Sequence, residues 1–147
     1  MAARRTSPTR EVEALADRLH SAALHLLRRL RTEDEALGVS SPRLSALSVV
    51  VAAGPIGIGA LAATEGVSAP TMTRLVDGLE REGYVRRAVD PADARGVLVR
   101  PTARGRRLLT EGRARRVRFL ADALRDLSPD EVSAVGRGAD LIERLGR

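Results

Sequence analysis

Residues 58–102 have the sequence IGALAATEGVSAPTMTRLVDGLEREGYVRRAVDPADARGVLVRPT, and this stretch decides the fold that we predict. Its first part predicts a short helix over 59–65 that ends at Gly66, because glycine adopts the positive φ with which many helices end. Ser68 can cap a second helix with its hydroxyl group, and Pro70 suits the first turn, where a missing backbone N–H costs little. The pattern is that of a helix-turn-helix.

The second helix of this pair is amphipathic, and Gly83 ends it. Apolar side chains recur along it at three- and four-residue spacing, which predicts that one face belongs to the core. These apolar residues are Met72, Leu75, Val76 and Leu79. Beyond Gly83 we expect a hairpin with strands near 84–87 and 96–99, joined by a polar turn over 90–93. A helix-turn-helix followed by such a hairpin is a winged helix-turn-helix.

Three motifs in this stretch resemble the multiple-antibiotic-resistance regulator (MarR) family of bacterial transcription factors. They are S-x-P-T-x-T-R-L-V-D over 68–77, L-E-x-x-G-x-V-x-R over 79–87, and D-P-x-D-x-R-x-x-x-V over 90–99 with its trailing P-T. The length of the chain and its flanking helices resemble the family as well. The resemblance implies a mainly α-helical fold with a small β-wing, flanked by long N- and C-terminal dimerisation helices.

The front of the second helix carries the side chains with which we expect the protein to contact DNA. An α-helix fits the major groove, where hydroxyl and guanidinium groups bind base edges and phosphate oxygens. The candidate residues of this recognition helix are Ser68, Ala69, Pro70, Thr71, Thr73 and Arg74. Helix capping is the alternative role of the hydroxyl groups. Capping alone does not explain why Thr73 and Arg74 share the exposed side.

The wing is strongly basic. Residues 84–107 include seven arginines and two aspartates, whereas the first 53 residues contain eight arginines and six acidic side chains. The resemblance implies that Arg95 enters the minor groove and that Asp93 holds its guanidinium group, which agrees with the negative potential of a narrow minor groove. A solvent-exposed surface ion pair is the alternative. Arg86 and Arg87 are candidates for phosphate contacts, with simple solvation of one of them as the alternative.

The chain departs from the family pattern at three positions. Ala94 stands where a second basic residue usually precedes the wing arginine, and Gly78 where the second helix usually has a basic residue. Gly59 stands where a capping Ser or Thr is typical. Glycine inside a helix also lowers its stability. We therefore expect weaker phosphate anchoring, with Arg86, Arg87 and the basic N-terminal residues 1–9 contributing more.

The segments on either side of the winged unit predict further helices. The expected ranges are 10–37, 43–53, 103–127 and 129 to the end of the chain. Ser41 is the expected cap of the second of these helices, and Ser128 with Glu131 forms a capping box at the start of the last. Residues 54–57 are either a linker or a short strand that pairs with the wing.

Three of these helices are long and amphipathic, and they have more apolar surface than one small winged domain can cover. We therefore expect a single domain over 1–147 that forms a homodimer through residues 1–37 and 103–147. Residues 42–102 would bind double-stranded DNA. The resemblance implies the same dimer, whose recognition helices would lie about 34 Å apart and contact two half-sites of a pseudo-palindromic operator.

The composition restricts the other functions. All 25 basic residues are arginine, and the net charge is +6. The sequence contains no cysteine, which excludes disulfides and a thiol-based redox sensor. No apolar run approaches the about 20 residues that a membrane span requires, and residues 1–10 lack the apolar core of a secretory signal. We therefore expect a cytoplasmic protein without a membrane partner.

The sequence shows no catalytic constellation, so we expect no enzyme, no metal and no other cofactor. His20 and His25 lie about 140° apart on the predicted first helix and do not converge on a metal. The resemblance implies a small-molecule effector in a cleft between the dimer helices and the winged unit. Because Tyr84 and Phe119 are the only aromatic residues, the sequence argues against a stacked aromatic ligand. An aliphatic ligand, or none, is left.

The function that the sequence predicts is transcriptional regulation, most often repression among proteins that resemble this one. Two alternatives come from other classes: a structural protein that coats DNA with little sequence preference, and a winged-helix module for protein–protein assembly. A regulator should prefer its operator over random DNA by about 10³-fold or more. An assembly module should tolerate the Arg74→Ala and Arg95→Ala substitutions.

Overall fold

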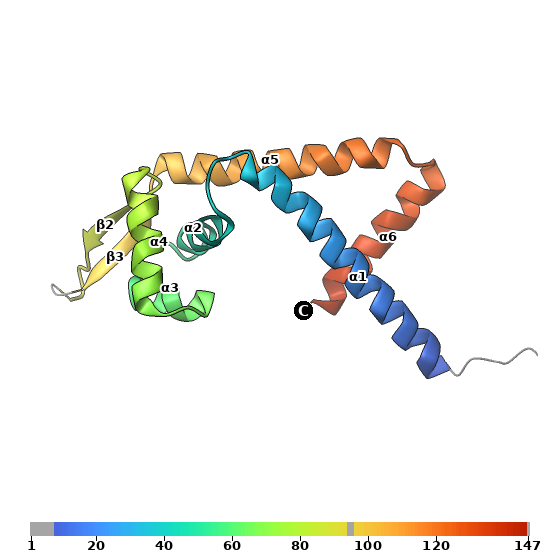
Figure 1. The fold of residues 1–147 in the computed structure, drawn as a ribbon, viewed down its shortest axis with the longest axis horizontal. Helices are drawn as coiled ribbons and strands as arrows, with labels where there is room; N and C mark the ends of the chain where they lie inside the picture. The colour runs from blue at the N-terminus through green and yellow to red at the C-terminus, as the bar shows by residue number, and fades with distance from the viewer. Residues whose placement is uncertain (1–7, 94–95, 147) are drawn as a thin grey trace, which may run out of the picture.

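The computed structural model describes residues 8–93 and 96–146. Its elements, in chain order, are α1 (Pro8–Glu35), α2 (Ser41–Ala53), β1 (Ile56–Gly57), α3 (Ile58–Glu65), α4 (Ala69–Arg81), β2 (Val85–Val89), β3 (Val97–Pro101), α5 (Ala103–Arg125) and α6 (Pro129–Leu145). Figure 1 shows a winged unit, formed by α2 to β3, at one end of the molecule and the long helices α1, α5 and α6 extending away from it. This arrangement confirms the predicted fold class.

The hydrophobic core lies inside the winged unit. Helices α2, α3 and α4 and the sheet each contribute side chains to it. The largest fully buried side chains are Leu47, Val50, Leu61, Met72, Val76, Leu79, Val85 and Val99. Each burial of this kind contributes about 1.5–3 kcal/mol. The predicted apolar face of α4 is confirmed, with Leu75 only partly buried against the core.

The sheet is antiparallel and has the strand order β1-β3-β2. Ile56 lies opposite Val99, so residues 56–57 form the third strand, which was one of the two predicted alternatives for this segment. Arg87 also lies opposite Val99, on the other side of β3. Because paired residues share a face of the sheet and Val99 is buried, Arg87 is on the face that covers the core.

Helix α3 ends, and helices α4 and α6 begin, with the local conformations and hydrogen bonds that the sequence predicts. Gly66 adopts a φ of 65°, and the Ser68 hydroxyl accepts a hydrogen bond from the backbone N–H of Thr71 at 3.3 Å. The capping box of Ser128 and Glu131 is complete. Its backbone and side-chain hydrogen bonds lower the pKa of Glu131. The capping contribution of Glu131 is therefore present above its unfolded-state pKa and is lost as the pH falls through the folded value.

Three helices begin one or two residues earlier than predicted, since α1 begins at Pro8 and not at residue 10, and α2 and α3 also differ. Helix α2 begins at Ser41, and the capping position belongs to Ser40, which makes no side-chain cap hydrogen bond. Ser40 itself is extended, with φ −65° and ψ 148°, and the buried Val39 directly precedes it. Helix α3 begins at Ile58 with Gly57 as its N-cap residue, so Gly59 lies inside the helix. The chain enters α3 directly from β1, because pairing with β3 keeps residues 56–57 extended.

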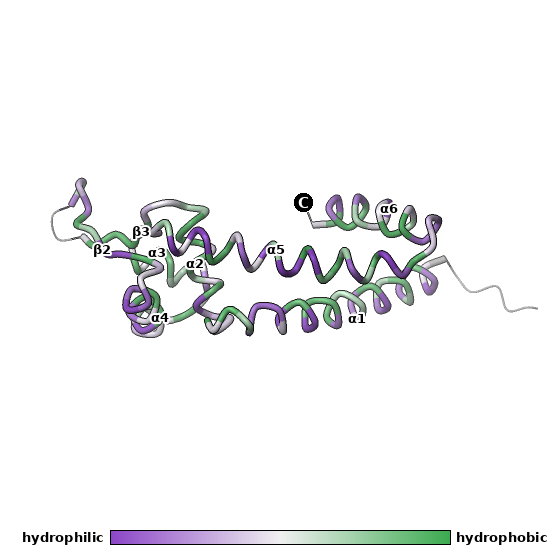
Figure 2. Tube along the Cα trace, turned by 90° about the horizontal axis from the view of Figure 1, so that it is seen from above, coloured by the Kyte–Doolittle hydropathy of each residue, from purple (hydrophilic) through white to green (hydrophobic). Residues whose placement is uncertain are grey.

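The long helices leave much apolar surface uncovered. Helix α1 packs against α5, where Asp34 pairs with Arg116 and the guanidinium of Arg29 lies 5.5 Å from the centre of the Phe119 ring. Helix α6 contains no buried residue, and Figure 2 shows it turned back along α5 with apolar segments on all three helices. The exposed apolar residues of these helices include Val12, Leu15, Leu19, Leu24, Leu26, Leu27, Val117, Val132, Val135, Leu141, Ile142 and Leu145.

Candidate nucleic-acid interface

The exposed face of α4 carries the predicted recognition residues. The side chains that face solvent at the start of this helix are Ser68, Ala69, Pro70, Thr71 and Arg74. Thr73 is half-buried. Within residues 8–93 and 96–146, no acidic side chain pairs with Arg74. Its guanidinium is therefore available to an external acceptor.

The hydroxyl groups on this face differ in what they can offer to a ligand. The oxygens of Ser68 and Thr71 lie 2.9 Å apart, so one hydroxyl donates to the other and a single O–H remains free between them. The hydroxyl of Thr73 donates to the carbonyl of Ala69 at 2.9 Å and can only accept from a ligand. Capping is thus part of the role of Ser68, as the sequence indicated. The face still offers one hydroxyl donor, hydroxyl acceptors and a guanidinium group.

Arg87 links the wing to α4 through a backbone hydrogen bond and two ion pairs. Its backbone N–H donates to Glu80 Oε1 at 2.8 Å, and its guanidinium forms ion pairs with Glu80 Oε2 and with Asp77 Oδ1, the latter at 2.6 Å. Partial burial lowers the pKa of Arg87, but the hydrogen bonds and charges of the two carboxylates outweigh this effect and raise the pKa above its ordinary value. Arg87 therefore positions the wing against the recognition helix, a role beyond the phosphate contact that the sequence suggested.

The sequence analysis did not identify Asp77 and Glu80 as partners of Arg87. The motif L-E-x-x-G-x-V-x-R contains the signal, since Glu80 and Arg87 flank the turn at Gly83. A helix followed by a turn and a returning strand brings its last turn opposite the start of that strand. Opposite charges at these two places predict an ion pair.

The Arg87→Gln substitution is expected to lower the free energy of unfolding by about 1 kcal/mol, because charge-assisted hydrogen bonds to partly exposed carboxylates are lost. Urea unfolding would measure this change. Arg86→Gln is the matched control, since Arg86 lies on the same strand but is exposed on the other face. In a double-mutant cycle, Arg87→Gln and Glu80→Gln should be non-additive by about 0.5 kcal/mol or more. Simple additivity of the two free-energy changes would contradict the proposed coupling between Arg87 and Glu80.

The remaining wing residues are only partly described. Arg86 is exposed and lies opposite Arg100 on β3, so two positive charges share this face of the wing. Asp93 is exposed, and its carbonyl accepts a hydrogen bond from the backbone N–H of Gly96 at 2.8 Å, which closes the turn between the strands. Arg95 and Ala94 lie outside the described residues, and with them the predicted contact between Asp93 and Arg95.

Gly78 is buried under a side chain from α2. A Cβ atom at residue 78 would lie 2.7 Å from both Cζ and Nε of Arg43, whose guanidinium donates to Glu82 Oε1 at 2.7 Å. In this chain the flexible end of the Arg43 side chain covers the position that family members usually fill with a basic residue. The guanidinium of Arg43 lies there instead and ties α2 to the end of α4.

Other kinds of site are not indicated. Over residues 8–93 and 96–146, no cluster of three or more His, Asp or Glu side chains is arranged to hold a metal ion. In the same residues no helix combines the length and the apolar character that crossing a membrane would require. The fold and the exposed polar face of α4 define a winged helix-turn-helix protein.

Comparisons with known proteins identify the family. The MarR family model matches residues 39–97. An HTH-type transcriptional regulator of Mycobacterium tuberculosis is 38% identical over 131 residues, which cover 89% of this chain and 92% of the relative. The chain belongs to the MarR family of HTH-type transcriptional regulators, which are not enzymes.

Solved structures agree with this assignment. A transcriptional regulator from Pseudomonas aeruginosa has a TM-score of 0.82 and 29% identity, covering 95% of this chain and 99% of its own. A mutant of MepR from S. aureus, bound to an oligodeoxyribonucleotide, has a TM-score of 0.72, 19% identity and coverage of 90% and 96%. At this low identity the MepR structure supports the fold alone.

Proposed function

We propose that this regulator is a repressor that binds a pseudo-palindromic operator as a homodimer and leaves it when a small molecule binds. The observation that carries the proposal is the exposed polar face of α4, on which Arg74 has no acidic partner among the described residues. The recognition residues would be Ser68, Ala69, Pro70, Thr71, Thr73 and Arg74. The MepR mutant bound to an oligodeoxyribonucleotide supports DNA as the ligand of this fold.

The wing would make the second contact with DNA. The ion pairs of Arg87 with Asp77 and Glu80 link β2 to α4, and they would hold the wing and the recognition helix in one relative orientation. Arg95 would enter the minor groove, with Asp93 orienting it, and Arg86 would contact phosphate. Rigid coupling favours binding because little conformational entropy is lost when both elements engage the duplex together.

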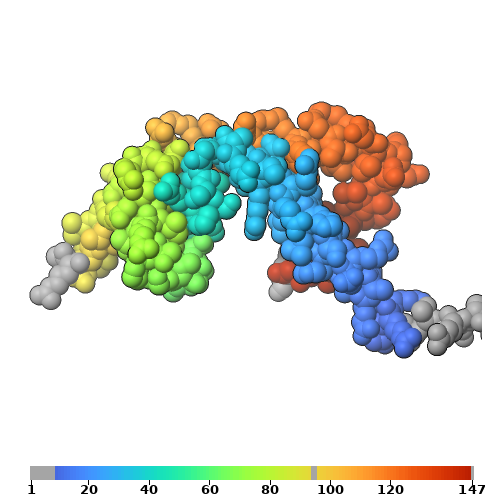
Figure 3. Space-filling model, viewed as in Figure 1, coloured from blue at the N-terminus to red at the C-terminus, as the bar shows by residue number. Residues whose placement is uncertain are grey.

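The uncovered helices α1, α5 and α6 would form the dimer interface. Leu15 on α1 is 61% exposed and Ile142 on α6 is 52% exposed. Exposed apolar side chains gathered on three helices are typical of a protein–protein interface. Figure 3 shows the winged unit on one side and the arm formed by α1 and α6 on the other. The two parts meet at the top of the view, where α5 lies, and a hollow separates them below. A second copy packed on the arm would cover the apolar side chains and leave both α4 helices free.

A double variant, Leu15→Glu with Ile142→Glu, is expected to convert the dimer into a monomer. Carboxylates buried without partners should weaken self-association by at least about 100-fold. Sedimentation would show half the mass of the wild type, and operator binding should fall with it. Val89→Glu is the matched control, because Val89 is 66% exposed but lies on the wing. A double variant that still sediments as a dimer would reject this interface.

A binding titration tests the proposed function as a whole. Wild type and Arg95→Ala would be titrated against the DNA upstream of the coding sequence and against a scrambled duplex at the same salt concentration. A preference of about 10³-fold for the upstream DNA, weakened by the substitution, is expected. Equal binding to both duplexes would indicate a DNA-coating protein. Binding to neither would indicate a protein-assembly module.

A further inference from the structure

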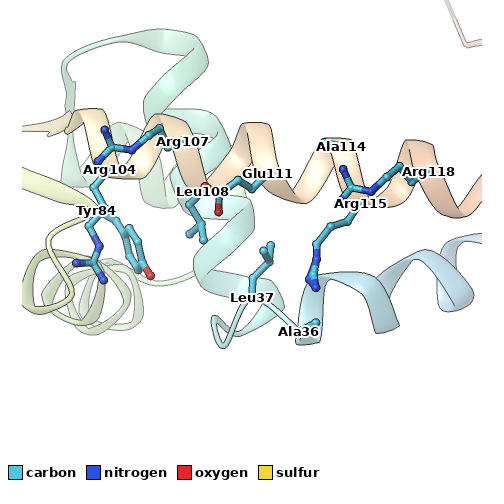
Figure 4. A pocket seen from close by; sticks show the side chains of 10 residues that line it. All are labelled: Ala36, Leu37, Tyr84, Arg104, Arg107, Leu108, Glu111, Ala114, Arg115 and Arg118. Atoms are coloured by element: carbon cyan, nitrogen blue, oxygen red, sulfur yellow. The ribbon is translucent and has the colours of Figure 1, made fainter.

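We propose that the effector is a non-aromatic organic polyanion and that it binds an arginine-lined cavity beneath α5. This inference rests on the proposed function, because it identifies the ligand class that would release the repressor from DNA. The cavity has a volume of about 540 Å³ and lies between the end of α1, the start of the wing and the part of α5 from Arg104 to Arg118. Figure 4 shows it with the side chains that line it.

One side of α5 supplies the charged wall of the cavity. The charged residues that line it are Arg104, Arg107, Glu111, Arg115 and Arg118. Their spacing of three and four residues keeps them on one side of the helix. Figure 4 shows Arg115 reaching from α5 toward Ala36 at the end of α1, while Arg104 lies beside Tyr84 at the opposite end. The arginines therefore line the cavity from one end to the other.

Arginines outnumber acidic residues among the side chains that line this cavity, and Glu33 and Asp122 line the neighbouring pocket that Arg115 and Arg118 share. Four arginines and one acidic residue, Glu111, line the cavity. In the described part of the chain, none of Arg107, Arg115 and Arg118 forms an ion pair. A ligand with one carboxylate would neutralise a single guanidinium and leave the rest of the positive charge on the wall unbalanced. A ligand with two or more carboxylate or phosphate groups matches the wall, since guanidinium groups bind both in a bidentate manner.

The aromatic side chains of the protein offer an aromatic ligand little surface in this cavity, because Phe119 does not line it and Tyr84 is buried. Tyr84 and Phe119 are the only two in the sequence. The guanidinium of Arg104 lies 5.1 Å from the centre of the Tyr84 ring, and that of Arg29 lies 5.5 Å from the centre of the Phe119 ring. Each ring thus already has a cation over its face. The apolar part of the wall consists of aliphatic side chains such as Leu37 and Leu108, which suit a short aliphatic body.

The position of the cavity suits an effector. Leu37 follows the dimer helix α1, whereas Tyr84 begins the wing and is buried. The carbonyl of Tyr84 accepts hydrogen bonds from the backbone N–H of Thr102 at 3.0 Å and from its hydroxyl at 3.1 Å. A ligand between these walls contacts the arm and the winged unit at once. It therefore stabilises one orientation of the winged unit relative to the arm. If DNA binding requires a different orientation, the ligand releases the protein from DNA.

Isothermal titration calorimetry in the absence of DNA tests the ligand class. Citrate and fructose 1,6-bisphosphate are the polyanionic probes, one with carboxylates and one with phosphates, and benzoate is the aromatic monoanion. All titrations keep the ionic strength constant with sodium chloride. We expect at least one polyanion to bind wild type at least about tenfold more tightly than benzoate, because it engages at least one more guanidinium. Which of the two binds more tightly identifies the anionic group.

The variant Arg107→Gln with Arg115→Gln should raise the dissociation constant of the polyanion by about tenfold or more. Arg106→Gln with Arg113→Gln is the matched control, since both arginines are exposed on the same helix but do not line the cavity. It should change the constant by less than about twofold. Equal loss in both variants would mean diffuse binding to a basic surface and would overturn the site. Benzoate binding as tight as that of the polyanions, or no binding of any probe, would overturn the ligand class.

A DNA-binding assay separates this inference from the proposed function. The preferred polyanion should weaken binding of wild type to the upstream DNA by about tenfold or more, and should act much less on the Arg107→Gln, Arg115→Gln variant. If wild type binds the upstream DNA but the polyanion does not weaken that binding, the effector assignment fails and the repressor stands. If the polyanion binds but no operator is found, the proposed function fails and the cavity stands.

Discussion

The Gly105→Ala substitution is expected to destabilise the winged unit by about 3 kcal/mol or more, although alanine is the better helix former. A Cβ atom at residue 105 would lie 2.2 Å from the carbonyl oxygen of Tyr84 and 3.2 Å from Cδ1 of Leu47. The carbonyl belongs to the backbone at the start of the wing and already accepts two hydrogen bonds from Thr102. Neither the strand nor α5 can move without breaking these contacts. Urea unfolding measures the loss.

Gly78→Ala is the matched control for this prediction. Gly78 is also a buried glycine in a helix, and its added Cβ atom would lie 2.7 Å from Arg43. Here the obstacle is the flexible end of a side chain, which can swing out at the cost of a partly exposed ion pair with Glu82 worth under about 1 kcal/mol. The gain in helix propensity of about 1 kcal/mol offsets this loss. Gly78→Ala should leave the free energy of unfolding nearly unchanged. If Gly105→Ala is as stable as wild type, the close approach of residue 105 to the Tyr84 carbonyl is refuted.

The Arg74→Ala substitution is expected to weaken operator binding by roughly 30- to 1000-fold. One contact of an arginine with a base or phosphate contributes about 1–2 kcal/mol, and a symmetric dimer loses two such contacts, which gives about 2–4 kcal/mol. Fluorescence anisotropy with the operator duplex measures the change. The salt dependence identifies the contact, because loss of two phosphate contacts lowers the slope of log K against log salt by about 2. Loss of a base contact instead lowers the preference over random DNA.

Arg81→Ala is the control for Arg74→Ala. Arg81 is equally exposed on α4 but lies in its last turn, far from the end of the helix that would enter the groove. It should change operator affinity by less than about threefold. If the affinity of Arg74→Ala for the operator is within threefold of that of wild type, Arg74 does not contribute to operator recognition. Both variants should unfold as wild type does, because neither arginine packs in the core.

The sequence by itself determined the helices, the turns and the family. The cap at Ser68, the positive φ of Gly66 and the capping box at Ser128 depend on contacts within a few residues, so their signals are adjacent in the chain. The apolar spacing of α4 predicted its buried face for the same reason, because helical geometry relates spacing to direction. The candidate residues on the exposed face of α4 followed from this assignment. Their contacts with DNA stay a prediction.

Only the tertiary structure decided which distant residues meet. The ion pairs of Arg87, the cover of Arg43 over Gly78 and the approach of Gly105 to Tyr84 join segments that are separate in the sequence. The cavity beneath α5 likewise needs the end of α1 and the start of the wing to lie beside the same helix. Such contacts depend on the relative placement of whole helices. Side-chain packing determines that placement, and it cannot be predicted from the spacing of residues along the chain.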